Sequence, residues 1–266
     1  MAGAGSAMGR RPAGAAADVE VGFIDADGTP RRELLSGCWN VAFERVAPYG
    51  VCVVPPARNR PGLWWFASTG EHVGHESWLE RDRLMALDAD PEVVRVAAQP
   101  MWLRWTAESG RPVRHAPDYF ARHADGTGVV IEVRADQRVG DQDAAVFAAT
   151  ARLCAQVGWE YQRVGELGPV HAANLRCLSG YRHPRFAQPE LSARLGEVFA
   201  GGAPLLSGAA TAGDRVAALP VLFGMLWRGK RTAELEGDLL GPATLVHTRE
   251  SCAGDRRDSA AAEPAG

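Results

Sequence analysis

Residues 115 to 134 read His-Ala-Pro-Asp-Tyr-Phe-Ala-Arg-His-Ala-Asp-Gly-Thr-Gly-Val-Val-Ile-Glu-Val-Arg. Near the middle of this stretch, Asp125-Gly126 is a strong signal for the tight turn of a β-hairpin. Residues 119–121 before the turn are apolar or aromatic, and residues 129–133 after it are rich in the β-branched side chains that favour strands. The stretch therefore predicts two antiparallel strands on which the rest of the chain is organised.

Charged residues stand at one end of this predicted hairpin. Glu132 and Arg134 are two positions apart, so their side chains point to the same face of a strand. Asp118 follows Pro117 at the start of the paired strand. Because an unpaired charge is costly inside a buried strand, two carboxylates and one cation at this end predict a polar site.

The spacing of these residues is that of the PD-(D/E)xK nucleases. Pro-Asp is followed thirteen residues later by Glu-x-Arg, with Arg134 where lysine is usual. Mg²⁺, which Mn²⁺ can replace, prefers the hard oxygen ligands that Asp118 and Glu132 supply. The ion activates water and stabilises displacement at phosphorus, and a nearby cation neutralises developing charge. The alternative is a surface hairpin with an aspartate cap and a Glu132–Arg134 ion pair.

A helix predicted over residues 75–87 adds a further carboxylate. Glu80 lies on the same face of this helix as Leu84 and Leu87, which form its packing surface. Glu76 lies on that face one turn nearer the helix start. A carboxylate on a packing face is expected to point into a polar site. The alternative is that both glutamates are solvated and pair with neighbouring arginines.

Composition limits the remaining possibilities. The net charge of the 266 residues is −3, so a DNA-binding surface would be a local basic patch. Five cysteines without a CxxC pair indicate neither a disulfide framework nor a zinc site, which fits a reducing cytoplasm. No apolar run approaches the length of a membrane span. The segments 1–18 and 251–266 have the composition of disordered tails.

A small basic patch is expected within residues 174–185. It combines cationic side chains with an aromatic ring and so suits contact with DNA phosphates. A solvated loop with cations at a helix end is the alternative. The predicted DNA-binding residues are Arg176, Tyr181, Arg182, His183 and Arg185.

Residues 186–250 are expected to form a small, mainly helical unit. Helices followed by a short strand are typical of a winged-helix-like module. The unit lacks a helix dense in Arg, Asn and Gln, so we expect it to bind a protein partner rather than specific DNA. The predicted elements are helices at 191–199, 215–228 and 232–240, a linker at 201–213 and a strand at 244–246.

Helical and strand-like segments alternate from residue 19 to 185, which predicts an α/β core with a central mixed sheet flanked by helices. In their order and spacing, short segments between about residues 20 and 246 resemble the TnsA-type endonuclease subunits of heteromeric transposases, in the form seen in actinobacteria. The main segments are Pro-Gly-Leu-Trp-Trp (61–65), Thr-Gly-Glu-His-Val-Gly-His-Glu-Ser-Trp-Leu-Glu-Arg-Asp (69–82), Leu-Asp-Ala-Asp-Pro (87–91), Gln-Pro (99–100), His-Ala-Pro-Asp (115–118), Glu-Val-Arg (132–134), Gly-Trp (158–159) and Leu-Ser-Gly-Tyr-Arg-His-Pro-Arg (178–185).

The resemblance implies a restriction-endonuclease-like domain over residues 19–185 that uses Mg²⁺ to cut one DNA strand at transposon ends. It also implies two protein partners, a DDE-type transposase and an AAA+ ATPase regulator. The family's catalytic residues fall on Glu80, Asp118, Glu132 and Arg134, of which the three acids would bind the metal. Glu76 is the alternative to Glu80. Arginine in place of lysine keeps a positive charge but removes a group that can release a proton.

Two other functions fit the same residues. A non-cleaving assembly subunit would keep the fold and bridge the transposase and the ATPase, and Arg134 favours this reading. A stand-alone PD-(D/E)xK nuclease would act in restriction or repair, and its gene would not lie beside genes for a transposase and an ATPase.

Overall fold

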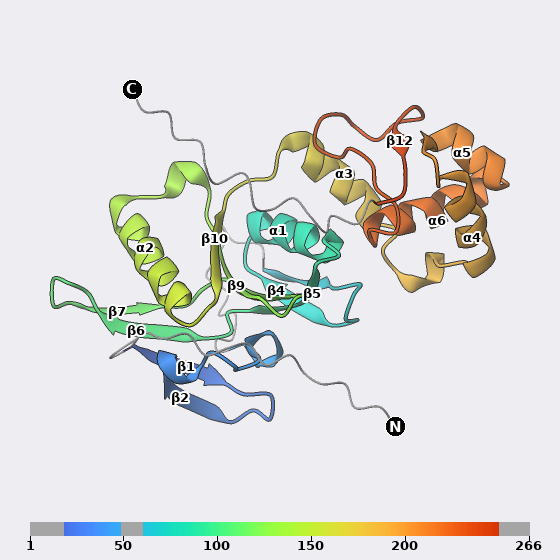
Figure 1. Cartoon of the computed structure of the whole chain (residues 1–266). Coiled ribbons are helices and arrows are strands. Elements are labelled where there is room, and N and C mark those ends of the chain that lie inside the picture. Colours follow the sequence, from blue (N-terminus) through green and yellow to red (C-terminus); the bar gives the residue numbers. More distant parts are fainter. Residues whose placement is uncertain (1–18, 49–60, 250–266) are drawn as a thin grey trace. The chain divides into compact units, whose positions relative to one another are not determined.

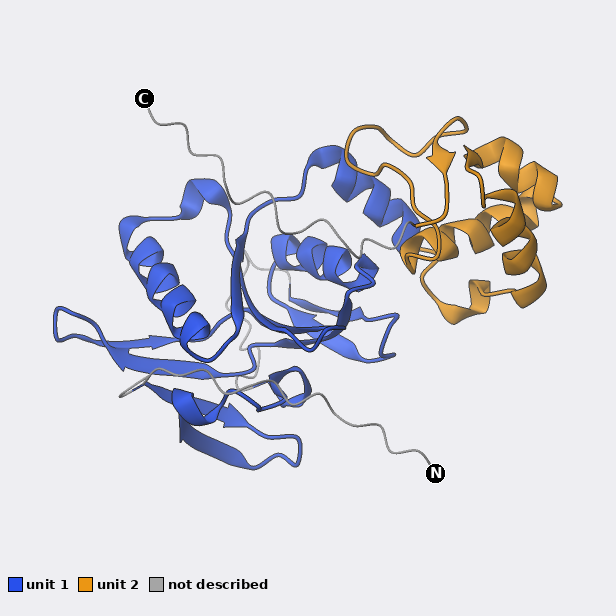
Figure 2. Cartoon of the chain, in the orientation of Figure 1, with its two compact units in different colours: residues 1–179 blue, residues 180–266 orange. Residues whose placement is uncertain are grey.

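The computed structural model describes residues 19–48 and 61–249. The chain divides between Ser179 and Gly180 into two compact units, which are described separately (Figure 2). From the sequence we placed this division slightly later, between residues 185 and 186. The two predicted disordered tails lie outside the described residues.

Unit 1 contains a mixed four-stranded sheet in the order β10-β9-β8-β5 (Figure 1). Strands β8 and β9 are antiparallel and form the predicted hairpin, with Gly126 in its turn at φ 90°. Strand β10 is parallel to β9, and the chain reaches it through helix α2, because parallel neighbours need a crossover connection. The predicted α/β class with a mixed sheet is confirmed. The bounds are β5 Val93–Ala98, β8 Tyr119–His123, β9 Gly128–Val133, α2 Asp141–Gln156 and β10 Glu160–Val164.

Both faces of this sheet are covered, because successive side chains on a strand point to opposite faces. Ile131 on one face packs in a cluster that includes Leu84 of helix α1 (Trp78–Ala89). Val130 on the other face packs in a cluster that includes Cys154 of α2. Strand β9 is therefore buried along nearly its whole length, which is why its sequence is almost continuously apolar.

The predicted start of the first helix, at His75, is wrong by three residues. His72–His75 instead form strand β4, which pairs with β3 (Gly62–Trp65). Helix α1 begins at Trp78 because Ser77 caps it, accepting a hydrogen bond from the Glu80 amide at 3.2 Å. Glu76 therefore precedes the helix and is not on its packing face.

A second sheet of unit 1 has the order β2-β1-β6-β7, with all neighbours antiparallel. Strands β6 and β7 form a hairpin. Ala116 and Pro117 separate β7 from β8, so His115 and Asp118 belong to different sheets. The bounds are β1 Glu20–Ile24, β2 Pro30–Leu34, β6 Trp102–Thr106 and β7 Pro112–His115. Unit 1 also contains η1 Leu35–Gly37, η2 Phe43–Arg45, η3 Asp136–Arg138 and α3 Pro169–Ser179.

Unit 2 is mainly helical, as predicted. Its described elements are η4 Pro184–Phe186, α4 Pro189–Val198, β11 Ala203–Pro204, α5 Leu205–Ala212, α6 Arg215–Trp227 and β12 Leu245–Val246. The short strands β11 and β12 pair in antiparallel fashion. None of the described helices could cross a membrane alone; by length and composition α5 and α6 pass only as a pair, bent by 117°.

Two predictions for unit 2 are wrong. The stretch 201–213 is not a linker, because most of it forms α5. Its small residues allow close packing: a Cβ on Gly208 would lie 2.3 Å from the Phe199 ring. Residues 232–240 do not form the predicted third helix; they are irregular, with a bend at 236–238 and a single bridge between Thr232 and His247.

Candidate functional site

Asp118 immediately precedes β8, at the start of the strand, where the sequence placed it. One of its carboxylate oxygens accepts a hydrogen bond from the Val133 amide at 2.7 Å, which ties it to the neighbouring strand β9. The last paired position of the hairpin is Tyr119 with Ile131, so Asp118 faces Glu132 one step further along. The structure therefore brings together the two carboxylates that the hairpin pattern predicted to converge.

Glu132 is only 3% exposed. Its carboxylate forms a hydrogen bond with Nε2 of His115, which lies on β7 in the second sheet. Burial raises the pKa of Glu132, while the hydrogen bond and charge of His115, and then the charge of Arg134, act against that rise. From the sequence we assigned no role to His115. Its position three residues before Asp118 is the feature that could have indicated one.

Glu80 is held at the start of α1. Its carboxylate accepts hydrogen bonds from the Glu76 amide at 2.8 Å and from the Ser77 hydroxyl at 2.7 Å. With the Ser77 cap, these bonds form a capping box. The Tyr119 hydroxyl also lies 3.4 Å from the Glu80 carboxylate. Glu80 thus approaches the hairpin, but part of its hydrogen-bonding capacity is used by the helix terminus.

Glu76, the alternative to Glu80, is fixed by a side chain that the sequence did not single out for the site. Gln99 Nε2 donates to the Glu76 carboxylate at 2.9 Å, and the Gln99 amide donates to the Asp118 carbonyl at 2.8 Å. Gln99 has a φ of 42°, which is unusual for a residue other than glycine. Neither glutamate pairs with a neighbouring arginine: Arg81 bonds to Asp82, and Arg83 donates to the Gly165 carbonyl.

A pocket of about 430 Å³ opens beside these acids. Its lining includes Glu76, Glu80 and Asp118 but not Glu132. His75 also lines the pocket; it is 8% exposed, its Nδ1 has no hydrogen-bond partner among the described residues, and burial lowers its pKa. Gly62 permits this packing, since a Cβ there would lie 2.7 Å from the His75 ring.

Carboxylate crowding changes the chemistry of Asp118. Burial raises its pKa well above the ordinary value of 3.8, and the negative charges of Glu132, Glu80 and Glu76 raise it further. The Val133 amide only partly opposes this effect. A bound cation would relieve the repulsion, because an opposite charge favours the ionised form.

The donor set can be compared with the needs of Mg²⁺. Among residues 19–48 and 61–249, no three His, Cys, Asp or Glu side chains are arranged to hold a metal ion together. Glu132 is engaged by His115, and Glu80 by the helix terminus. Mg²⁺ is often held by one or two carboxylates, with water and phosphate oxygens as the other ligands. Asp118 and Glu80, which line one pocket, are hard oxygen donors of that kind.

Arg134 does not join the carboxylates. It follows the end of β9, where its amide donates to the Val164 carbonyl at 2.9 Å. Its guanidinium is exposed and lies 3.1 Å from the Asp143 carboxylate, in the first turn of α2. The Glu132–Arg134 ion pair of the alternative interpretation is not observed, although the charge of Arg134 still lowers the pKa of Glu132.

The predicted basic patch is divided between the two units. Arg176 belongs to unit 1, where it pairs with Asp82 at 2.5 Å. In unit 2, Tyr181 packs against Phe186 and Phe223, with ring centroids 5.3 and 5.0 Å away. Its ring is thus already occupied by packing within the unit.

The other three residues of the patch lie in unit 2. Arg185 stacks over the Phe186 ring at 4.8 Å, and its amide donates to His183 Nδ1. The carbonyls of Arg182 and His183 accept hydrogen bonds from Arg228. This segment therefore has a defined packing role in unit 2.

No protein-family model matches the chain, and no curated protein matches its sequence.

Proposed function

We propose that this protein is a Mg²⁺-dependent endodeoxyribonuclease with a restriction-endonuclease-like core. The observation that carries the proposal is the crowding of acids around Asp118, which raises its pKa beside a pocket lined by Glu76 and Glu80. A cluster of carboxylates that repel one another at the end of a hairpin is suited to a divalent cation.

Within this proposal, Asp118 and Glu80 would hold the metal, with Glu76 as the alternative to Glu80, and Glu132 would join them by exchanging its bond with His115 for the ion. When bound, the ion would activate water and stabilise displacement at phosphorus. The Val133 amide fixes the orientation of Asp118. His115 holds Glu132 and offsets part of the cost of burying its charge. Arg134 would move from Asp143 to the scissile phosphate and neutralise its charge.

The proposed role is that of the TnsA-type subunit of a heteromeric transposase, which cuts one strand of duplex DNA at transposon ends in the cytoplasm. The proposed partners are a DDE-type transposase and an AAA+ ATPase. Unit 2, proposed to be winged-helix-like, would bind a protein partner. Its large apolar side chains that remain exposed support this: Val216 is 81% exposed, Leu239 63% and Leu245 62%.

The deciding experiment is strand cleavage of a transposon-end duplex in Mg²⁺ or Mn²⁺, with the transposase and ATPase present. Wild type should nick one strand, and Asp118→Asn and Glu132→Gln should not. Binding of the same duplex, with circular dichroism, controls for DNA affinity and folding. Nicking that survives either substitution would remove that residue from the metal site.

A second function, a non-cleaving assembly subunit, is favoured by one observation. Arg134 stands where the nuclease pattern has lysine, and it is paired with Asp143 rather than directed at the acids. In the same experiment, a wild type that assembles with both partners on end DNA without nicking it would establish this alternative.

A further inference from the structure

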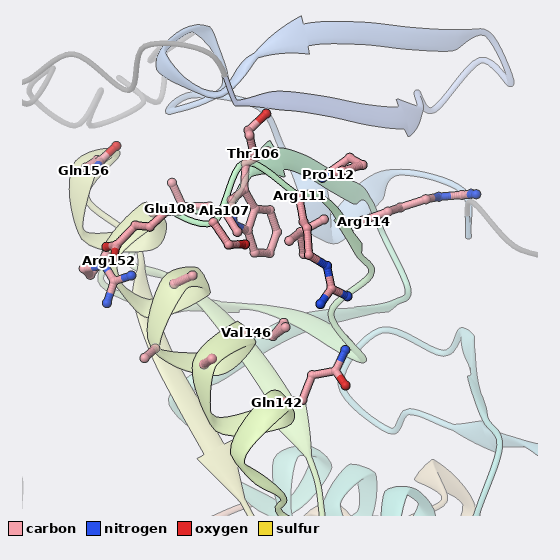
Figure 3. A pocket seen from close by; sticks show the side chains of 17 residues that line it. Thr106, Ala107, Glu108, Arg111, Pro112, Arg114, Gln142, Val146, Arg152 and Gln156 are labelled. Atoms are coloured by element: carbon pink, nitrogen blue, oxygen red, sulfur yellow. The ribbon is translucent and has the colours of Figure 1, made fainter.

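A second pocket, of about 830 Å³, lies between the β6–β7 hairpin and helix α2 (Figure 3). It is separate from the pocket beside Asp118, since the two share no lining residue. We call it the hairpin groove. One wall comes from Trp105 to Arg114 on the hairpin, and the other from the α2 face between Gln142 and Gln156.

The sequence places arginines on both walls. Arg111 directly precedes β7, and the period of two puts it on the same face as Val113 and His115. On α2, Gln142, Ala149, Arg152 and Gln156 follow one another at helical spacing along one face. Small side chains on that face leave the space open; the alanines lining the groove are Ala145, Ala148 and Ala149.

The charges of Arg111 and Arg152 are not neutralised within the protein. Both residues are exposed, and neither guanidinium has a hydrogen-bond or ion-pair partner among the described residues. Several other arginines of unit 1 form ion pairs, among them Arg81 with Asp82, Arg122 with Glu44, Arg134 with Asp143 and Arg163 with Asp136. Glu108 is the single acid among the residues that line the groove. The groove is therefore suited to a polyanion.

The groove leads toward the carboxylates. The face of β7 that carries Arg111 also carries His115, which bonds to Glu132. At the same end, the His115 ring lies 6.4 Å from Phe147 of α2, and Arg134 pairs with Asp143 in the first turn of that helix. A strand of DNA lying in the groove would thus leave it next to the residues proposed to act on the phosphodiester.

From these observations we infer that the hairpin groove binds the sugar-phosphate backbone of duplex DNA, with Arg111 and Arg152 contacting phosphates and Gln142 and Gln156 donating hydrogen bonds beside them. Arginine and glutamine contacts of this kind position a protein on a duplex without reading its sequence. This inference rests on the proposed endonuclease function, because it takes DNA as the substrate.

Arg45 provides a matched control. It is an exposed arginine of η2 in the same unit, and it is not among the residues that line the groove. Its removal changes the net charge by the same amount as the removal of Arg111.

The test measures fluorescence anisotropy of a labelled duplex without divalent metal, so that binding is separated from cleavage. Over a range of salt concentrations, the Arg111→Ala/Arg152→Ala variant should bind more weakly than wild type. The slope of log affinity against log salt is negative, and it should become less steep by about 0.9 for each lost phosphate contact, hence by about 1.8. Arg45→Ala should keep the wild-type slope, and Glu108→Gln should bind more tightly. Thermal unfolding confirms that each variant is folded.

Wild-type affinity and slope in the double variant would overturn the inference, as would an equal loss in Arg45→Ala. So would a wild type that binds no duplex. The two proposals fail separately: a wild type that binds DNA through the two arginines but never nicks it refutes the endonuclease and retains the groove. A wild type that nicks, with a double variant that binds equally well, refutes the groove and retains the endonuclease.

Discussion

Asp118 stores an electrostatic cost that a metal ion can relieve. Its pKa is raised in the folded protein, so the folded state holds the proton more tightly than the unfolded state does. The resulting stability is fully present below the unfolded value of 3.8 and is lost as pH rises through the raised folded value. Compared with acidic pH, Asp118 therefore destabilises the fold at neutral pH.

Asp118→Asn should consequently raise the melting temperature at neutral pH. Each unit by which the pKa is raised corresponds to about 1.4 kcal/mol, and the asparagine oxygen can still accept the Val133 amide. The difference should vanish below about pH 3.8. Mg²⁺ should raise the melting temperature of wild type but not that of the variant. Thermal unfolding with and without Mg²⁺ measures both effects, and identical pH and Mg²⁺ responses in the two proteins would contradict them.

Arg134 should act on phosphate charge rather than on the metal. Arg134→Ala should reduce single-turnover cleavage about 100-fold or more, the scale of removing one positioned donor, whereas Arg134→Lys should keep substantial activity. Asp143→Asn releases the arginine from its ion pair and should leave the rate at or above that of wild type. Calorimetry should show unchanged Mg²⁺ binding in all three variants. Full activity in Arg134→Ala would exclude this role.

Which site residues the sequence could predict depends on how local their partners are. Asp118 and Glu132 meet because the Asp-Gly turn sets which residues of the two strands are paired, and the alternation of side chains sets the face of the sheet on which each residue lies. Both signals are local in the sequence. His115 bonds to Glu132 from another sheet, and Arg134 pairs with Asp143 in the following helix. Such partners depend on how separate elements pack, which the spacing of residues along one strand does not encode.

At the scale of elements, the start of α1 is set by its cap. The Ser77 hydroxyl accepts a hydrogen bond from the Glu80 amide and also donates one to the Glu80 carboxylate. Ser77→Ala should therefore lower the free energy of unfolding by about 1 kcal/mol, while Ser77→Thr should retain most of it. Urea denaturation of the two variants provides the comparison. Equal stabilities would show that the capping box contributes nothing.

The same cap explains an error in the sequence-based prediction. Apolar spacing extended the helix back to His75, but the Ser-x-x-Glu pattern at 77–80 marks its true start. The error at 201–213 has a different cause. Small residues there indicated a flexible linker, whereas Gly208 is small because the Phe199 ring packs directly on it. Local composition cannot distinguish a residue that is small for flexibility from one that is small for close packing.

At the scale of the whole molecule, partner binding is expected to depend on unit 2. Most of the apolar side chains of α6 are buried in the core of their own unit, so they are not available to a partner. Exposed apolar side chains remain at Val216 and Leu239. Val216→Glu and Leu239→Glu should each weaken capture of the ATPase by about tenfold, the effect of losing roughly 1.4 kcal/mol.

These substitutions have a control in the other unit. Leu34 lies on β2 of unit 1 and is 57% exposed. Leu34→Glu therefore adds the same charge at an exposed position outside unit 2. Pull-down with the purified ATPase, together with melting temperatures, gives the comparison. Equal capture by all three variants would place the partner surface elsewhere.

The bond between His115 and Glu132 also bears on the order of folding. His115 belongs to β7 in the second sheet, and Glu132 to β9 in the central sheet. A chain in which only the central sheet had formed would bury the Glu132 carboxylate without this partner, which is unfavourable. The two sheets are therefore expected to become stable together. Hydrogen exchange should show the amides of β7 and β9 opening in one cooperative event.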